Sequence, residues 1–216
     1  MLKYLNAVHG LQLETPFDKL AASGLLPDRA QPRARKLQEA DLPQWWKAVD
    51  SIAPMHRDYL LLLAYSGMRR NEWAFMLRAN VDFEQQRIYL PDTKTNRPHS
   101  LPITPKMREL LLRRCEGLGA DDCLFSGLSV EHVADMAMRA GAPKFILHDL
   151  RKLLATIGEK LGFSDAIMRR ILNHVAKRSD TLYRHYVEIG ETDLMEPLIA
   201  IQSRLDDLMS KSCDSC

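Results

Sequence analysis

Apolar side chains recur at three- and four-residue intervals along most of the chain after residue 36, which is the spacing of one helix face. The pattern predicts helices over residues 39–50, 54–66, 70–78, 105–116, 129–140, 148–161, 164–173, 177–187 and 193–210. Residues 81–104 differ, because short β-prone runs at 81–83, 87–90 and 99–103 alternate there with polar turns. The expected fold class is therefore mainly α with a small antiparallel β-sheet of about three strands.

The segment before residue 37 lacks this pattern. Residues 21–36 place Gly24, Pro27 and Pro32 among four basic side chains, which predicts an exposed linker. Residues 1–20 are too short to fold alone, so we expect Met1 to begin inside a longer architecture. The chain is accordingly divided into an interdomain segment and linker at 1–36, a main domain at 37–187 and an acidic C-terminal segment at 188–216.

The C-terminal segment has one apolar helix face, formed by Leu194, Leu198, Ile201, Leu205 and Leu208. Residues 187–216 carry seven acidic and only two basic side chains, whereas residues 51–115 carry eleven basic and six acidic ones. The net charge of +2 therefore hides a moderately basic body, which is compatible with an anionic partner, and an acidic tail. The apolar face of this tail can pack on its own domain or on a neighbouring copy, and the sequence leaves both open.

Composition excludes several classes of protein. With 216 residues, 46% of them hydrophobic and 27% charged, the chain is neither disordered nor fibrous. Its longest apolar run, at 59–65, is too short to span a bilayer, and no signal peptide precedes it, so we expect no membrane association. Four cysteines are too few for a disulfide framework. Cys213 and Cys216 lack two further ligands nearby, so no metal site is expected and a reducing cytosol is favoured.

Chemistry-bearing side chains occur in four places along the chain. Arg69 follows a glycine at the end of the most apolar helix, where Glu72 can orient it through a charge-assisted hydrogen bond. His148 and Arg151 are three residues apart, so they share one helix face. Lys94 lies between the second and third strands, and the sequence Leu-Asn-His ends at His174, nine residues before Tyr183. Taken singly, each of these side chains is typical of an ordinary surface or core position.

Taken together, their order and intervals resemble the catalytic domain of the tyrosine recombinases, the integrase family. The most specific pieces are SGMRRNE at 66–72, HDLR at 148–151, and LNH at 172–174 with the tyrosine nine residues on, an interval that selects Tyr183 over Tyr186. The wording around Tyr183 looks most like integrases of phages and integrated elements in Gram-negative bacteria. The resemblance runs from Leu37 to Val187 and implies the tyrosine recombinase catalytic-domain fold, with the active site formed by Arg69, Lys94, His148, Arg151, His174 and Tyr183 and supported by Glu72.

The chemistry implied by this resemblance is site-specific DNA strand cleavage and rejoining through a covalent 3′-phosphotyrosine. Tyr183 attacks the phosphodiester, while Arg69 and Arg151 bind the non-bridging oxygens more tightly in the transition state than in the ground state. His148 and His174 complete the cradle, and His148 can also accept the tyrosine proton. A mobile ammonium such as Lys94 suits protonation of the leaving 5′-oxygen, and neither a metal nor a cofactor is required.

The resemblance further implies double-stranded DNA as the partner, a homotetramer assembled on DNA through the C-terminal segment, and action in the bacterial cytoplasm. Two other interpretations remain. Residues 161–186 can form a helix-turn-helix of a DNA-binding module without chemistry, carrying Lys177, Arg178 and Arg184 on its second helix. A type IB topoisomerase shares the same chemistry and would relax supercoiled DNA without a specific site.

Overall fold

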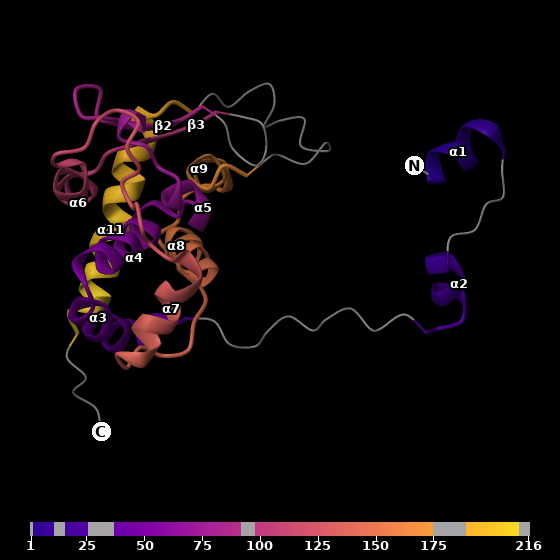
Figure 1. Cartoon of the computed structure of the whole chain (residues 1–216), viewed down its shortest axis with the longest axis horizontal. Coiled ribbons are helices and arrows are strands. Elements are labelled where there is room, and N and C mark those ends of the chain that lie inside the picture. The colour runs from indigo at the N-terminus through magenta and orange to yellow at the C-terminus, as the bar shows by residue number, and fades with distance from the viewer. Residues whose placement is uncertain (1, 11–15, 26–36, 92–97, 175–188, 212–216) are drawn as a thin grey trace. The chain divides into compact units, whose positions relative to one another are not determined.

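The computed structural model describes residues 2–10, 16–25, 37–91, 98–174 and 189–211 (Figure 1). The chain divides into two compact units, Met1–Ala34 and Arg35–Cys216. The first unit contains α1 (Leu2–His9) and α2 (Pro16–Ala22). In the part of the chain that the structure describes, no helix combines the length and hydrophobicity needed to cross a membrane.

The second unit is mostly helical, with one small sheet. Its strands are β1 (Val81–Asp82), β2 (Arg87–Leu90) and β3 (His99–Pro102), in the order β1-β2-β3 and antiparallel throughout, with Val81 opposite Ile88 and Leu90 opposite His99. The helices are α3 (Leu42–Ser51), α4 (Pro54–Ser66), α5 (Arg70–Ala74), α6 (Pro105–Cys115), α7 (Val130–Arg139), α8 (Leu147–Lys160), α9 (Asp165–Ile171) and α11 (Met195–Met209), with short 3-10 turns η1 (Glu39–Asp41), η2 (Arg78–Asn80) and η3 (Thr192–Leu194). This confirms the predicted fold class.

One predicted helix is shorter in the structure, and another cannot be compared with it. The helix expected over 70–78 ends at Ala74, because Met76 enters the core, its carbonyl accepts a hydrogen bond from the Leu124 amide at 2.9 Å, and Leu77 pairs with Cys123 in a β-bridge. The tertiary pairing with residues 123–124 therefore overrides the helical periodicity of this stretch. The helix expected over 177–187 lies outside the described residues.

Helix α4 forms the centre of the second unit, packed against α3, α5, α6, α8 and α11 (Figure 1). Its residues 58–66 are all buried, which explains the run of apolar residues that the sequence shows there. A helix that is apolar on every face is stable only when other elements surround it. Trp45 of α3 and Trp73 of α5 are fully buried in the same core.

Helix α11 packs on its own unit, against α3, α4 and α8. The five predicted apolar positions, four of them in α11 and Leu194 at the end of η3, are all buried. Polar contacts also specify this docking. The buried Gln202 donates its Nε2 proton to the Tyr65 carbonyl at 3.0 Å and accepts from the Thr104 hydroxyl at 2.7 Å, and the Tyr65 hydroxyl donates to Asp206 at 2.6 Å. The question that the sequence left open is therefore answered for α11, whose apolar face packs in cis.

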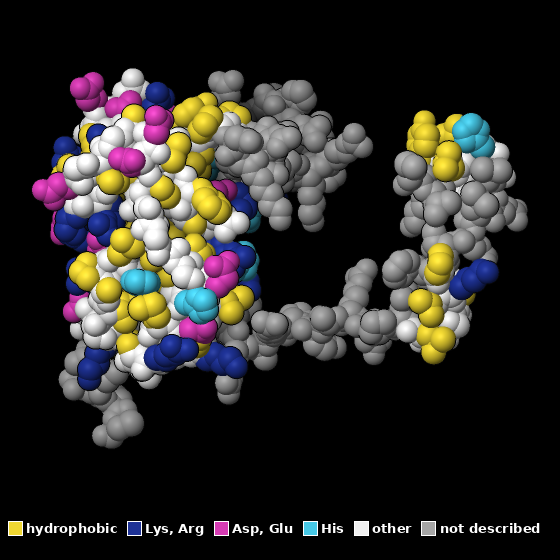
Figure 2. Space-filling model, viewed as in Figure 1, with side chains coloured by type: hydrophobic (Ala, Val, Ile, Leu, Met, Phe, Trp, Pro, Cys, Tyr) yellow, Lys and Arg dark blue, Asp and Glu magenta, His cyan; other side chains and the backbone are white. Residues whose placement is uncertain are grey.

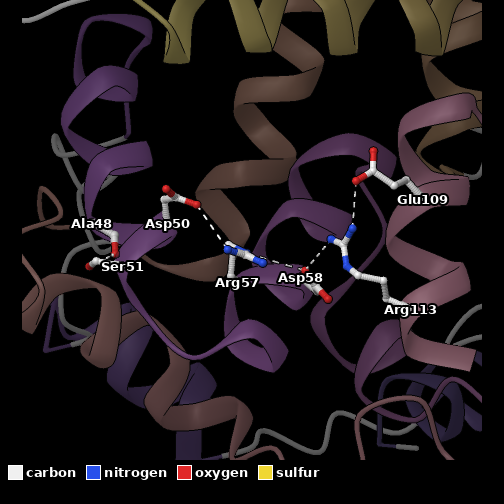
Figure 3. Close-up of polar contacts among 7 residues, drawn as sticks. All are labelled: Ala48, Asp50, Ser51, Arg57, Asp58, Glu109 and Arg113. Atoms are coloured by element: carbon white, nitrogen blue, oxygen red, sulfur yellow. Dashed lines mark hydrogen bonds and ion pairs between the residues drawn. The ribbon is translucent and has the colours of Figure 1, made fainter. Parts of the chain in front are cut away.

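A network of ion pairs joins α3, α4 and α6 (Figure 3). At its centre is Asp58, which is 2% exposed and lies 3.1 Å from Arg113 Nη2 and 3.8 Å from Arg57 Nε. Arg57 also reaches Asp50 at 3.3 Å, and Arg113 reaches Glu109 at 2.9 Å. A buried carboxylate is tolerated only when cations compensate its lost hydration, which these two arginines do.

Basic and acidic side chains are interspersed over the visible face of the second unit (Figure 2). Hydrophobic side chains lie among them. The excess of basic residues in segment 51–115 is thus not gathered into one broad patch on this face, among the residues drawn in colour. A smaller cluster of cations, Arg69 and Arg151, lies where the ends of α4 and α9 meet α8.

Candidate active site

The turn after α4 positions the first arginine. Gly67 ends the helix in the left-handed region at φ +65°, where its amide bonds the Leu63 carbonyl at 3.0 Å. The buried Ser66 hydroxyl accepts hydrogen bonds from the Trp73 indole at 2.8 Å and the Met68 amide at 3.2 Å. These contacts fix the path of the short connection from α4 to α5. Arg69 is the last residue of this connection, directly before the first residue of α5.

Glu72 holds Arg69 at both its backbone and its side chain. The Arg69 amide donates to Glu72 Oε2 at 2.7 Å, and Arg69 Nη1 donates to Glu72 Oε1 at 2.8 Å. The Arg69 side chain nevertheless remains 27% exposed. The guanidinium is thus oriented by a carboxylate and still has an open side available to a ligand.

Arg151, in the first half of α8, is only 5% exposed. Its Nη1 donates to the Gly67 carbonyl at 2.5 Å, and its Nη2 donates to the Leu172 carbonyl. Burial and, to a lesser extent, the nearby Arg69 lower the pKa of Arg151 to about 10, while Glu72 opposes the shift. The side chain therefore stays cationic at neutral pH, although its charge is poorly compensated.

The end of α9 provides the carbonyls that receive both arginines. The His174 amide bonds the Arg169 carbonyl at 2.9 Å and the Asn173 amide bonds the Arg170 carbonyl at 3.3 Å, with Asn173 at φ +46°. This is a Schellman motif, which turns the chain away after the helix. The carbonyl of Leu172 accepts from Arg151, and that of Asn173 accepts from Arg69 Nη2 at 3.4 Å.

Carbonyls at a helix C-terminus lack partners within the helix and carry the negative end of its dipole. Two guanidiniums are therefore suitable partners for the carbonyls that follow α9. The same turn places His174 on the surface, near the two arginines that the carbonyls of the turn hold. One backbone motif thus positions three of the predicted site residues at once.

Both site histidines are exposed and favour the neutral form. Burial of the ring lowers the pKa of His148, and Lys152 and Arg151 lower it further. The pKa of His174 is lowered by burial, then by Arg151 and Arg69. A neutral imidazole can accept a proton on one nitrogen and donate a hydrogen bond from the other.

A cavity of about 870 Å³ brings Arg69, Glu72, His148 and Arg151 together. Apolar residues, among them Phe75 and Leu90, also line it. His174 lies close enough for Arg151 and Arg69 to affect its protonation. Lys94 and Tyr183 lie outside the described residues, so the structure does not place them. No cluster of His, Cys, Asp or Glu within the described ranges could hold a metal ion.

Apart from Glu72, the groups that hold the arginines could not be identified from the sequence. These are mainly backbone carbonyls, at Gly67, Leu172 and Asn173, and a carbonyl has no sequence signature. Asn173 is a partial exception, because asparagine is one of the few residues that readily adopts the left-handed conformation at a helix end. Two cations and one neutral imidazole line the open cavity and a second neutral imidazole lies near the cations, an arrangement that suits the binding of a phosphate group with developing negative charge.

Comparisons with known proteins identify the family of this chain. Residues 35–188 match the model of the phage integrase family. The chain is 29% identical over 164 residues to the prophage integrase IntF of Escherichia coli strain K12, covering 69% of this chain and 34% of that protein. It is 28% identical over 129 residues to the tyrosine recombinase XerA of Saccharolobus solfataricus, covering 58% and 44% respectively. The chain thus spans about a third of the first relative and less than half of the second.

Solved structures show the same fold at low sequence identity. The integrase from mycobacterium phage Brujita superposes with a TM-score of 0.61 at 15% identity, covering 97% of this chain and 82% of that one. The Tn1549 transposon integrase, in complex with circular intermediate DNA, gives 0.58 at 15% identity, covering 89% and 73%. The lambda integrase tetramer bound to a Holliday junction gives 0.55 at 20% identity, covering 87% and 57%.

Proposed function

This chain belongs to the phage integrase family, and from that premise we propose that residues 37–187 are the catalytic domain of a site-specific DNA recombinase. The enzyme cleaves and rejoins double-stranded DNA by transesterification. The observation that carries the proposal is the pair formed by Arg69 and Arg151, which approach the same cavity and are both held by the turn after α9.

The arginine pair suits a phosphodiester in its transition state. Arg69 and Arg151 each lie in the electrostatic field of the other, and this repulsion contributes to the lowered pKa of Arg151. An anion between them relieves the repulsion, and a pentacoordinate phosphorus with extra charge on its non-bridging oxygens relieves it most. Because carbonyls already hold both guanidiniums, little reorganisation is needed when that charge develops.

We propose Tyr183 as the nucleophile and Lys94 as the general acid, on the family resemblance. The Tyr183 oxygen forms a bond to phosphorus, and the bond from phosphorus to the 5′-oxygen breaks. The phenol proton passes to His148, whose lowered pKa leaves its ring neutral, and the 5′-oxygen takes a proton from Lys94. The resulting 3′-phosphotyrosine retains the energy of the phosphodiester, so a 5′-hydroxyl can reverse the step without ATP.

We also propose that the enzyme works on DNA as a homotetramer, in the bacterial cytoplasm. The apolar face of α11 is occupied in cis, so it does not supply the contact in trans that the sequence suggested for it. The remaining candidates within the C-terminal segment are the exposed side of α11 and the residues on either side of that helix. Sedimentation with and without a captured DNA site measures the assembly, and a species that remains monomeric on DNA contradicts this part of the proposal.

The test uses nicked duplexes with a randomised core, in which the cleaved fragment diffuses away and the covalent complex accumulates. Captured strands are recovered under denaturing conditions and sequenced, which also identifies the preferred site. We expect Tyr183→Phe to abolish the covalent complex and Tyr186→Phe, the matched control three residues away, to retain it. A complex that survives Tyr183→Phe refutes the assignment of the nucleophile.

The same assay separates the other two interpretations. Sequence-specific binding without any covalent complex in the wild-type protein would favour a DNA-binding module. Relaxation of a supercoiled plasmid that lacks every captured site would favour a topoisomerase. We do not expect the first outcome, because a module without chemistry leaves the joint support of Arg69 and Arg151 unexplained. We do not expect the second, because the chain belongs to the phage integrase family.

A further inference from the structure

His99, the first residue of β3, is only 2% exposed. Its Nδ1 is 3.3 Å from Arg170 Nη1, and the same Arg170 nitrogen donates to the Ser100 carbonyl at 3.4 Å. The backbone of Ile171 lies close enough to the His99 ring to raise its pKa. One buried imidazole therefore contacts the last two residues of α9, which ends at Ile171.

The protonation state of His99 follows from its partner. A guanidinium can only donate hydrogen bonds, so Nδ1 must accept and the ring must be neutral, with its proton on Nε2. Burial is the largest of several causes that together lower the pKa of His99 to about 4; Arg170, Arg151 and Arg69 lower it as well, and the Ile171 backbone raises it. The ring is thus a fixed, uncharged bridge with one acceptor and one donor.

The two residues that His99 contacts come immediately before the two residues whose carbonyls hold the arginines. Arg170 and Ile171 are followed by Leu172, whose carbonyl accepts from Arg151, and by Asn173, whose carbonyl accepts from Arg69. A shift of the last turn of α9 would therefore move both acceptors together. Because the guanidiniums repel each other, their spacing depends on these acceptors.

We propose that His99 is a positioning residue for the reaction: it anchors the last turn of α9 to β3, so that the carbonyls of Leu172 and Asn173 hold Arg151 and Arg69 at the spacing that the transition state requires. The inference rests on the proposed function, since it concerns the same site. It assigns a role to a histidine that does not line the cavity and that acts only through other residues.

The first experiment compares two substitutions of His99 in single-turnover cleavage, at saturating concentrations of a duplex captured by the wild-type protein. His99→Leu removes both ring nitrogens, and we expect the rate to fall about 100-fold, the scale of a 1 Å misplacement of reacting groups. His99→Asn retains an acceptor near the position of Nδ1, and we expect it to restore a large part of the rate. The matched control is His132→Leu on α7, an exposed histidine paired with Ser129, which should cleave like the wild type.

A second substrate distinguishes positioning from general damage to the fold. A methylphosphonate at the scissile position replaces one anionic oxygen by a neutral methyl group, so its cleavage depends less on the spacing of the two guanidiniums. We expect His99→Leu to lose much less activity on this substrate than on the charged one. Parallel losses on both substrates would overturn the proposal and assign His99 a merely structural role.

A third measurement does not depend on DNA. The protein is labelled with nitrogen-15 arginine and studied by NMR. Because the Arg151 guanidinium is bonded to the Gly67 and Leu172 carbonyls, it should rotate slowly and give separate NH2 resonances. These resonances are assigned by their loss in Arg151→Lys. We expect these resonances to broaden or merge in His99→Leu. If they do so while the wild type captures no DNA, the proposed function fails and the anchoring role stands. If the wild type captures DNA and His99→Leu matches it in rate and spectrum, the inference fails alone.

Discussion

Replacing Gly67 by alanine should destabilise the second unit by about 2–5 kcal/mol, because backbone strain and overpacking act together. An alanine at φ +65° pays about 1–2 kcal/mol for the left-handed conformation. Its Cβ would lie 3.0 Å from Leu172 Cδ2 and 3.2 Å from the Leu154 methyl groups. Crowding of a packed core costs about 1–3 kcal/mol more. Urea denaturation measures the loss, followed by fluorescence of the buried Trp45 and Trp73.

The matched control is Gly117→Ala, at φ +72° with no atom within 4 Å of the new Cβ. It should cost only the backbone term of about 1–2 kcal/mol. Because Gly67 and Leu172 both provide carbonyls to Arg151, the Gly67 variant should also lose cleavage activity under conditions in which it is still folded. Equal losses of stability in the two variants would refute the close packing of α4 against α8 and the α9 turn.

Three further predictions concern stability and use the same denaturation assay. Asp58→Asn should lower the free energy of unfolding by about 1–3 kcal/mol, because two arginines lose a buried carboxylate. The control, Asp50→Asn, should lower it by less than about 1 kcal/mol, because the Asp50 side chain is 56% exposed. Equal effects of the two substitutions would contradict the network. Leu198→Ala on α11 should cost about 2–5 kcal/mol and the exposed Ile199→Ala under about 0.5, whereas a neutral Leu198→Ala would argue against docking in cis. Finally, the free energy of unfolding should fall by up to about 3 kcal/mol as the pH drops from 6.5 toward 4. The reason is that His99 becomes protonated in the unfolded chain but stays neutral in the folded chain, where its pKa is lowered to about 4. If His99→Asn leaves the slope of stability against pH unchanged, this explanation is wrong.

Much of the candidate site was predictable from spacing. The resemblance of their motifs and intervals to the integrase family led to the assignment of Arg69, His148, Arg151 and His174. The structure brings all four to one region, although as many as 105 positions separate them in the chain. Lys94 and Tyr183 lie outside the described residues, so their assignment stays a prediction. Glu72 was predicted as a support of Arg69, and the structure shows that contact. The backbone carbonyls that hold both arginines were not predictable, since they depend on how closely the α9 turn approaches α4 and α8.

His99 illustrates the same limit. Its sequence context predicts a β-strand, and the structure confirms that strand as β3. Nothing in a strand pattern indicates which helix end will pack against one of its side chains. The contact with Arg170 and Ile171 exists only because β3 and α9, 71 positions apart at the His99–Arg170 pair, lie side by side in the fold.

By itself, the sequence determined most of the local elements, because hydrophobic periodicity and glycine, proline and asparagine positions act within one or two turns of chain. The reactive side chains proposed from it rest on the resemblance to the integrase family. The sequence also determined that α11 would have one apolar face. The tertiary structure alone decided what that face covers, where α5 ends, and which backbone carbonyls hold Arg151 and Arg69. Those outcomes depend on shape and hydrogen-bond complementarity between segments distant in the chain, which no local pattern records.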